Sequence, residues 1–128
     1  MPALHDLTRS FEADSGIQIL VEVKGKPVRL SPDAERAVYR VAHEAIANAW
    51  RHSRCAILRL ELAFERREVV LRIRDDGVGL GPRGVDRGIG LGIITMRRAV
   101  AEVNGVLHVR NAGPRGVVVE ARVPRDAR

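Results

Sequence analysis

The sequence predicts an α+β fold, a two-layer α/β sandwich with three helices on one face of a mixed, mostly antiparallel sheet. The spacing of apolar residues alternates between helix and strand periods in the order helix, strand, helix, two strands, helix, two strands. Four of the strands arrive as two hairpins between lone helices, which favours helices layered on one face of the sheet. The 128 residues, 45% of them hydrophobic and 30% charged, are typical of one folded domain over residues 1–128.

The first half of the chain contains two expected helices and one strand. A short amphipathic helix begins near Leu4 and ends near Gly16. Residues 17–23 alternate apolar and polar side chains, which is the period of a half-buried strand. Ser31 is a good helix N-cap because a proline and an acidic residue follow it. We therefore expect one long helix over residues 34–52.

The second half contains one more helix between two hairpins. The four expected strands cover residues 55–62, 69–74, 106–110 and 117–123. Residues 76–90 are rich in glycine and read as an irregular segment with a mobile lid. Apolar residues return to helical spacing over residues 93–103, and Asn104 with Gly105 predicts the C-terminal cap of that helix.

The charge balance raises the question of nucleic-acid binding. The net charge is +6 and the isoelectric point is near 10.9. Nearly all the basic residues are arginines, however, and they are spread along the chain rather than gathered in a stripe. The few aromatic residues are too scattered for a base-stacking platform. We therefore expect no nucleic-acid partner, although a basic nucleic-acid-binding module remains an alternative.

The cysteine count and the hydropathy pattern indicate the cellular compartment in which the domain works. Cys55 is the only cysteine, so a disulfide within the chain and a cysteine-based zinc site are excluded, and a reducing environment is favoured. No run of about 18 apolar residues exists that would span a membrane. We expect a cytoplasmic domain.

The long expected helix carries polar residues along the edge of its apolar face. Glu44, Asn48 and His52 follow one another at intervals of four, and Arg51 lies beside them. Amide and carboxylate oxygens suit Mg²⁺, whereas imidazole and guanidinium groups suit phosphate oxygens. Taken alone, the stripe fits a solvated helix flank better than a ligand site.

Two glycine segments follow the first hairpin. Residues 75–79 (DDGVG) end a strand with an aspartate that can accept a hydrogen bond from an exocyclic amine. Residues 88–92 (GIGLG) lead into a helix whose free N–H groups favour phosphate. No GxxxxGK[ST] motif exists, and the GxGxxG match over residues 79–84 opens no helix, so neither a P-loop nor a dinucleotide fold is indicated.

Together these segments resemble the ATP-binding domain of sensor histidine kinases, in the GHKL superfamily with its Bergerat ATP-binding fold. Residues 43–52 (HEAIANAWRH) resemble the N box of that family, residues 75–79 its DxGxG box, and residues 88–92 with Met96 and Arg97 its second glycine box. The form of the second glycine box resembles the nitrate-sensor and DesK-like subclass, whose partners are LuxR-type response regulators.

The resemblance implies a role for each matching residue. Asn48 would coordinate Mg²⁺ and Glu44 would orient the attacking group, which makes these two the expected catalytic residues. Arg51 and His52 would face the phosphates of ATP, and Asp75 would bind the adenine amino group. The remaining expected nucleotide contacts are Gly77, Gly79, Gly88, Gly90, Leu91 and Gly92. The activity implied is phosphoryl transfer from ATP to a histidine.

The chain departs from the family pattern at three points. Arg98-Ala99 stands where Glu-Arg is common, and Val117 stands where a threonine is common, which puts a water-mediated adenine contact in doubt. The dimerising, phosphoacceptor helical pair is also missing, and we interpret His5 as incidental. The resemblance therefore implies an excised catalytic domain, monomeric when isolated, of a longer homodimeric kinase. The alternative within the superfamily is an anti-sigma-factor-type serine kinase.

Overall fold

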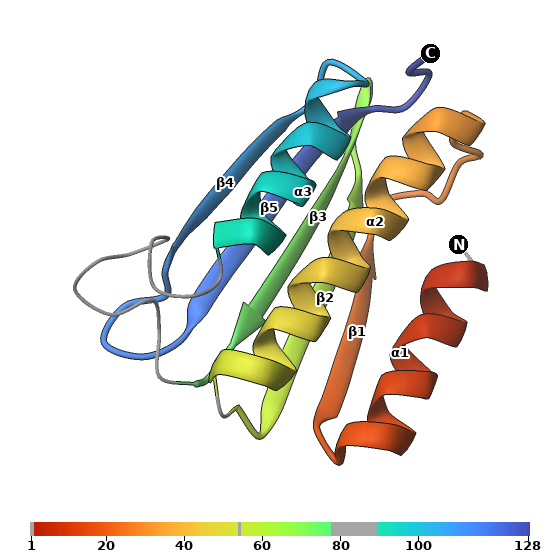
Figure 1. The fold of residues 1–128 in the computed structure, drawn as a ribbon. Helices are drawn as coiled ribbons and strands as arrows, with labels where there is room; N and C mark the ends of the chain where they lie inside the picture. The colour runs from red at the N-terminus through yellow and green to blue at the C-terminus, as the bar shows by residue number, and fades with distance from the viewer. Residues whose placement is uncertain (1, 54, 78–89) are drawn as a thin grey trace.

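The chain folds into a five-stranded sheet with three helices on one face (Figure 1). This computed structural model describes residues 2–53, 55–77 and 90–128. The helices are α1 (Pro2–Ser15), α2 (Pro32–Asn48) and α3 (Gly90–Ala101), and a π-helical turn, Ala49–Ser53, follows α2. The strands are β1 (Gln18–Lys24), β2 (Ile57–Phe64), β3 (Glu68–Asp75), β4 (Val106–Asn111) and β5 (Val117–Pro124). The predicted two-layer class and element order are confirmed.

The strand order in the sheet is β1-β2-β3-β5-β4. Strand β1 pairs with β2 in parallel, and the other three pairs are antiparallel. Helix α2 connects the two parallel strands and packs over the middle of the sheet between α1 and α3 (Figure 1). The sheet is therefore mixed, and its central strand β3 is hydrogen-bonded on one side to its hairpin partner and on the other to β5.

The core lies between the helices and the facing side of the sheet. Helix α2 buries its small and β-branched residues as its periodicity predicts, and Val38, Val41 and Ala42 are fully buried. Ser31 caps this helix, because its Oγ accepts a hydrogen bond from the Ala34 amide at 3.1 Å. At the end of α3, Asn104 adopts a left-handed φ of 59°, as the predicted cap requires.

Several element boundaries differ from prediction, and two of these lie beside the candidate site. The long helix ends as an α-helix at Asn48, and its last turn, Ala49–Ser53, is π-helical rather than α-helical. Such wide turns interrupt the regular spacing of side chains along a helix. Strand β2 begins at Ile57 rather than at residue 55, because the amides of Ala56 and Ile57 donate hydrogen bonds to the side chain of Asp76.

Candidate nucleotide site

Three element ends meet at one end of the sandwich: the C-terminal end of α2, the last residue of β3 and the N-terminal end of α3 (Figure 1). The residues singled out from the sequence lie at or near these ends wherever the structure describes them. The free amides of the first turn of α3 carry the partial positive charge of a helix N-terminus. This end of the molecule therefore combines polar side chains with a backbone that favours anions.

Asp75 is the last residue of β3, and only 8% of it is exposed. Its Oδ1 accepts hydrogen bonds from the amides of Gly77 at 2.9 Å and Val117 at 3.2 Å. Burial raises the pKa of Asp75, and the two amides counteract part of this effect. The carboxylate is thus held in one orientation by backbone groups, and among the described residues no hydrogen bond reaches its Oδ2.

Gly116 allows the amide of Val117 to reach the carboxylate of Asp75. It adopts a φ of +89°, and a Cβ at this position would overlap the carbonyl oxygen of Asp75. Only glycine therefore lets the chain entering β5 come close enough for Val117 to donate to Asp75. The second amide on Asp75 thus comes from a backbone position and does not depend on the Val117 side chain, which was one of the departures from the family pattern.

Asn48 and Gly92 are brought into contact between α2 and α3. A Cβ on Gly92 would lie 2.6 Å from Nδ2 and 2.9 Å from Oδ1 of Asn48, so the first turn of α3 packs directly on this amide. Oδ1 of Asn48 also accepts a hydrogen bond from Nη2 of Arg51 at 3.1 Å. The N box and the second glycine box, far apart in sequence, therefore meet at Asn48.

Glu44 lies one helical turn before Asn48 and is partly exposed. Within residues 2–53, 55–77 and 90–128, its carboxylate forms no hydrogen bond or ion pair, so it is available to a ligand or to another protein group. His52 lies in the π-helical turn, and Gly90 and Leu91 lie in the first turn of α3. Gly79 and Gly88 lie outside the described residues.

Asp76 has a role that the sequence did not indicate. Its Oδ1 accepts hydrogen bonds from the amides of Ala56 at 3.0 Å and Ile57 at 3.2 Å. These bonds, that of Ile57 foremost, lower the pKa of Asp76. The side chain fixes the start of β2 against the end of β3, and its partners are about 20 residues away in sequence, so no local pattern marks it.

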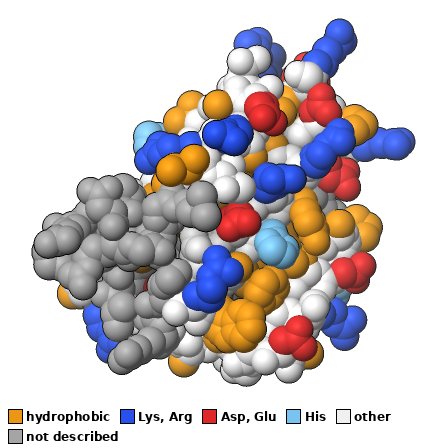
Figure 2. Space-filling view, in the orientation of Figure 1, with side chains coloured by type: hydrophobic (Ala, Val, Ile, Leu, Met, Phe, Trp, Pro, Cys, Tyr) orange, Lys and Arg blue, Asp and Glu red, His pale blue; other side chains and the backbone are white. Residues whose placement is uncertain are grey.

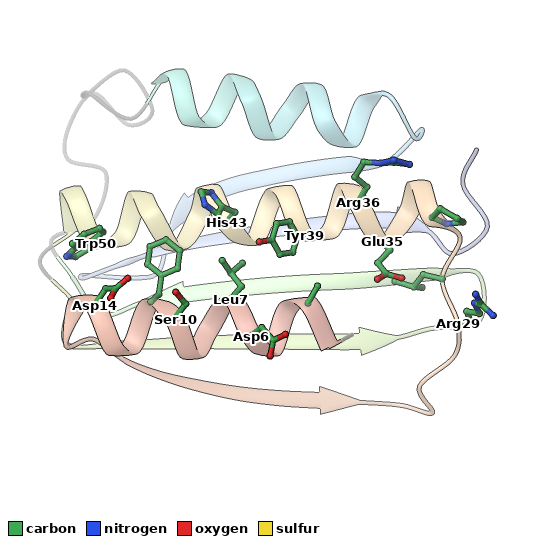
Figure 3. Close-up of a pocket in the computed structure, with 14 residues that line it drawn as sticks. Asp6, Leu7, Ser10, Asp14, Arg29, Glu35, Arg36, Tyr39, His43 and Trp50 are labelled. Carbon is green, nitrogen blue, oxygen red and sulfur yellow. The ribbon is translucent and has the colours of Figure 1, made fainter.

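A separate groove of about 1020 Å³ lies between α1 and α2 (Figure 3). Trp50 is 50% exposed there, and its ring meets Phe11 edge to face with centroids 6.1 Å apart. Phe11 meets the His43 ring in the same manner at 5.8 Å. Hydrophobic side chains gather on this face of the molecule, with charged side chains of both signs around them (Figure 2). None of the predicted nucleotide contacts lines the groove.

Residues 33–127 match the family model of histidine kinase-, DNA gyrase B- and HSP90-like ATPases. This match covers most of the chain, and the chain therefore belongs to that family. Within it, the chain is a domain of the sensor histidine kinase type, and its relatives support the nitrate-sensor-like subclass that the glycine box indicates.

Two curated relatives and one solved structure illustrate the similarity. The chain is 30% identical to the oxygen sensor histidine kinase NreB of Staphylococcus carnosus, over 95% of this chain and 35% of that protein. It is 28% identical to the sensor histidine kinase LnrJ of Bacillus subtilis, over 93% of this chain and 29% of that protein. The catalytic domain of histidine kinase ThkA has the same fold, with a TM-score of 0.79 at 15% identity over 98% of this chain and 91% of that one.

The chain thus spans about a third of the length of the curated relatives it matches. In the described part of the chain, no helix has the length and apolar character needed to cross a membrane. The same residues contain no group of three or more His, Cys, Asp or Glu side chains placed to hold a metal ion.

Proposed function

We propose that this chain binds ATP with Mg²⁺ at the candidate site and supplies the γ-phosphate to a histidine of a dimerisation and phosphoacceptor domain. That domain would belong to the same longer, homodimeric sensor kinase, and the phosphoryl group would pass on to a LuxR-type response regulator. The observation that carries the proposal is the buried Asp75 carboxylate, fixed by two backbone amides at a site framed by the family's boxes. The domain would work in the cytoplasm, where ATP is available.

Asp75 would recognise adenine. An ionised carboxylate only accepts hydrogen bonds, so it pairs with the exocyclic amino group of adenine and discriminates against a base that presents a carbonyl oxygen there. Because Oδ1 is already held by Gly77 and Val117, little freedom is lost when the base binds. Gly77 and Gly79 would let the backbone approach the nucleotide closely.

Asn48 would hold Mg²⁺ together with the phosphate oxygens of ATP. Mg²⁺ prefers oxygen ligands and usually combines one or two protein groups with phosphates and water, so a single amide oxygen fits this ion better than a cation that needs a complete protein cage. The bound ion would neutralise charge on the phosphates. Arg51, His52 and the glycines 88, 90 and 92, with Leu91, would surround the triphosphate at the N-terminus of α3.

In the reaction, an imidazole nitrogen of the acceptor histidine attacks the γ-phosphorus, the bond to the bridging oxygen of ADP breaks, and ADP leaves. Glu44 would accept a hydrogen bond from the acceptor imidazole and so orient the attacking nitrogen. The groove with Trp50 would receive the acceptor domain, because it exposes an aromatic ring beside the N box.

Calorimetric titration with a non-hydrolysable ATP analogue, with and without Mg²⁺, tests the site. We expect Asp75→Asn to weaken binding by about 1–3 kcal/mol. Asn48→Ala is expected to remove the Mg²⁺-dependent part of the affinity more than the metal-free part. Asp126→Asn, an exposed aspartate outside the site, serves as the matched control and should bind as the wild type does. Unchanged affinity in folded Asp75→Asn would refute the adenine assignment.

A labelling experiment separates the kinase classes. The parent's acceptor domain, mixed with this chain and γ-labelled ATP, should acquire an acid-labile label, as phosphohistidine does. An acid-stable label on a protein partner would instead support the anti-sigma-factor-type serine kinase. Affinity for DNA that falls with salt and ignores ATP would support the nucleic-acid module.

A further inference from the structure

The face of the sheet opposite the helices carries a row of arginines across four strands. Arg59 of β2 lies opposite Arg74 of β3, Arg74 lies opposite Val118 of β5, and Val118 lies opposite Arg110 of β4. Successive side chains of a strand point to opposite faces. The neighbours Leu58 and Ile73 are buried beneath the helices, so the arginines point away from them.

In the next row along the same face, the one arginine is paired with a carboxylate on each side. Arg72 donates to Glu61 and to Glu120, each at 2.8 Å. Glu120 also accepts from Arg122 at 3.2 Å. The guanidinium groups of Arg72 and of Arg122, which lies one row further along, therefore each have a carboxylate partner.

The three arginines of the first row have no such partners. Arg59, Arg74 and Arg110 are exposed and form no ion pair with any residue in 2–53, 55–77 or 90–128. Like charges placed directly opposite each other destabilise a sheet. Because neighbouring strands are about 5 Å apart, the guanidinium groups of Arg59 and Arg74 can reach one common ligand.

A pocket of about 610 Å³ lies at this row. It is lined by Ile57, Arg59, Arg74, Asp75, Asp76, Ala112, Pro114 and Arg115. Both carboxylates of this lining have an Oδ1 that accepts hydrogen bonds from two backbone amides. The guanidinium groups of Arg59, Arg74 and Arg115 thus line the pocket together with two carboxylates whose Oδ1 atoms are bonded to the backbone. In addition to the Ile57 amide, the charge of Arg115 helps to lower the pKa of Asp76.

We propose that the arginine row, defined as Arg59, Arg74 and Arg110 with Arg115 at its margin, binds a multivalent oxyanion of the phosphate type. Planar guanidinium forks bind tetrahedral oxyanions through paired hydrogen bonds, and two forks can share one such group. The row is only about 14 Å long, which suits one or two phosphate groups rather than a nucleic-acid strand. Among the described residues, Phe11, Tyr39 and Trp50 lie in the groove between α1 and α2 and Phe64 packs against the core, so no stacking platform accompanies the row.

The arginine row lies on the face of the sheet opposite the helices, and its pocket also includes Asp75, so it adjoins the proposed ATP site at the end of β3. Its ligand is either a free inorganic anion or a phosphate monoester carried on a larger molecule. In both cases the bound anion would relieve the repulsion between Arg59 and Arg74, so binding should stabilise the folded chain.

Thermal unfolding of the full 128-residue chain tests the proposal, with inorganic pyrophosphate and phosphoserine as separate probes and sodium chloride at equal ionic strength as the reference. The double variant Arg59→Gln/Arg74→Gln removes the shared ligands. Arg9→Gln/Arg40→Gln changes the net charge equally at exposed positions on α1 and α2 and is the matched control. Arg59→Lys/Arg74→Lys keeps the positive charges but removes the planar guanidinium groups.

We expect pyrophosphate to raise the midpoint temperature of unfolding of the wild type and of the control. The affinity of the glutamine variant for pyrophosphate should be lower by about tenfold or more. The lysine variant should keep part of the affinity. Stabilisation by phosphoserine as well would identify a monoester, and stabilisation by pyrophosphate alone would identify a free anion. Equal stabilisation of the wild type and the glutamine variant, or none beyond that of sodium chloride, would overturn the proposal.

Discussion

Gly113 and Gly116 form a matched pair for testing the contact that fixes Asp75. Both lie in the turn between β4 and β5 and both have a positive φ, +80° and +89° respectively. A Cβ on Gly113 would have no atom within 4 Å, whereas one on Gly116 would overlap the carbonyl oxygen of Asp75 and lie 3.0 Å from its carbonyl carbon. The two alanine variants therefore differ in this contact and share the backbone penalty.

The size of each effect follows from these contacts. Gly113→Ala should lower the free energy of unfolding by about 1–2 kcal/mol, the cost of a left-handed conformation for a residue with a Cβ. Gly116→Ala carries the same cost and must also move backbone atoms, which cannot rotate away as a side chain can. The Val117 amide then loses its hydrogen bond to Asp75, worth about 1–3 kcal/mol because the acceptor is buried and charged. We expect a total loss of about 3–5 kcal/mol.

Urea denaturation of both variants measures the difference, and titration with an ATP analogue measures the consequence for the site. Gly113→Ala should bind the analogue as the wild type does. Gly116→Ala, where it remains folded, should bind more weakly. Equal destabilisation of the two variants would refute the reasoning, because the contact with Asp75 would then contribute nothing.

Four further predictions concern the site and its surroundings. Gly92→Ala should change the free energy of unfolding by less than about 1 kcal/mol, because the helix preference of alanine offsets the cost of displacing the Asn48 side chain. Calorimetry should nevertheless show that this variant binds the ATP analogue with Mg²⁺ about tenfold more weakly. Since the pKa of Asp75 is raised on folding, its contribution to stability is fully present below its unfolded pKa and is lost as the pH rises through the folded pKa; Asp75→Asn should therefore gain stability relative to the wild type as the pH rises through that window in paired urea titrations. Asp76→Ala removes the acceptor of the Ala56 and Ile57 amides and should cost about 0.5–1.5 kcal/mol at neutral pH, since water can reach these exposed amides; because the pKa of Asp76 is lowered, this stabilisation is present above the unfolded pKa and lost as the pH falls through the folded pKa, so an equal deficit in strong acid would contradict it. The chain alone, incubated with γ-labelled ATP, should acquire no label, since the acceptor nitrogen must lie in line with the γ-phosphate; stoichiometric acid-labile label would implicate His5 instead.

Local patterns predicted the elements of this fold well. The apolar arc of α2 and the cap at Asn104 depend on residues a few positions apart, and both are found as expected. The boxes of the family also marked the ends of α2, β3 and α3 at which the site is formed. Such features can be read from the sequence because the interacting groups are close together in the chain.

The features that sequence analysis missed depend on distant partners. Asp76 fixes β2 through amides about 20 residues earlier, and the amide of Val117 reaches Asp75 across 42 residues. The π-helical turn after Asn48 breaks a periodicity that the sequence continues to His52. The order of strands and the arginine row likewise require the register of pairing, which no single segment contains.

The pairing of β3 with β5 makes the proposed nucleotide site a late product of folding. The Asp75 carboxylate and its first amide, that of Gly77, are only two residues apart in the chain, so this contact can form early. The second amide arrives only after a loop of about 40 residues has closed, which is a slow and entropically costly step. During synthesis, in a chain whose β5 has not yet paired, Asp75 would be held by only one of its two backbone amides. Affinity for nucleotide would therefore report that the last strand has joined the sheet.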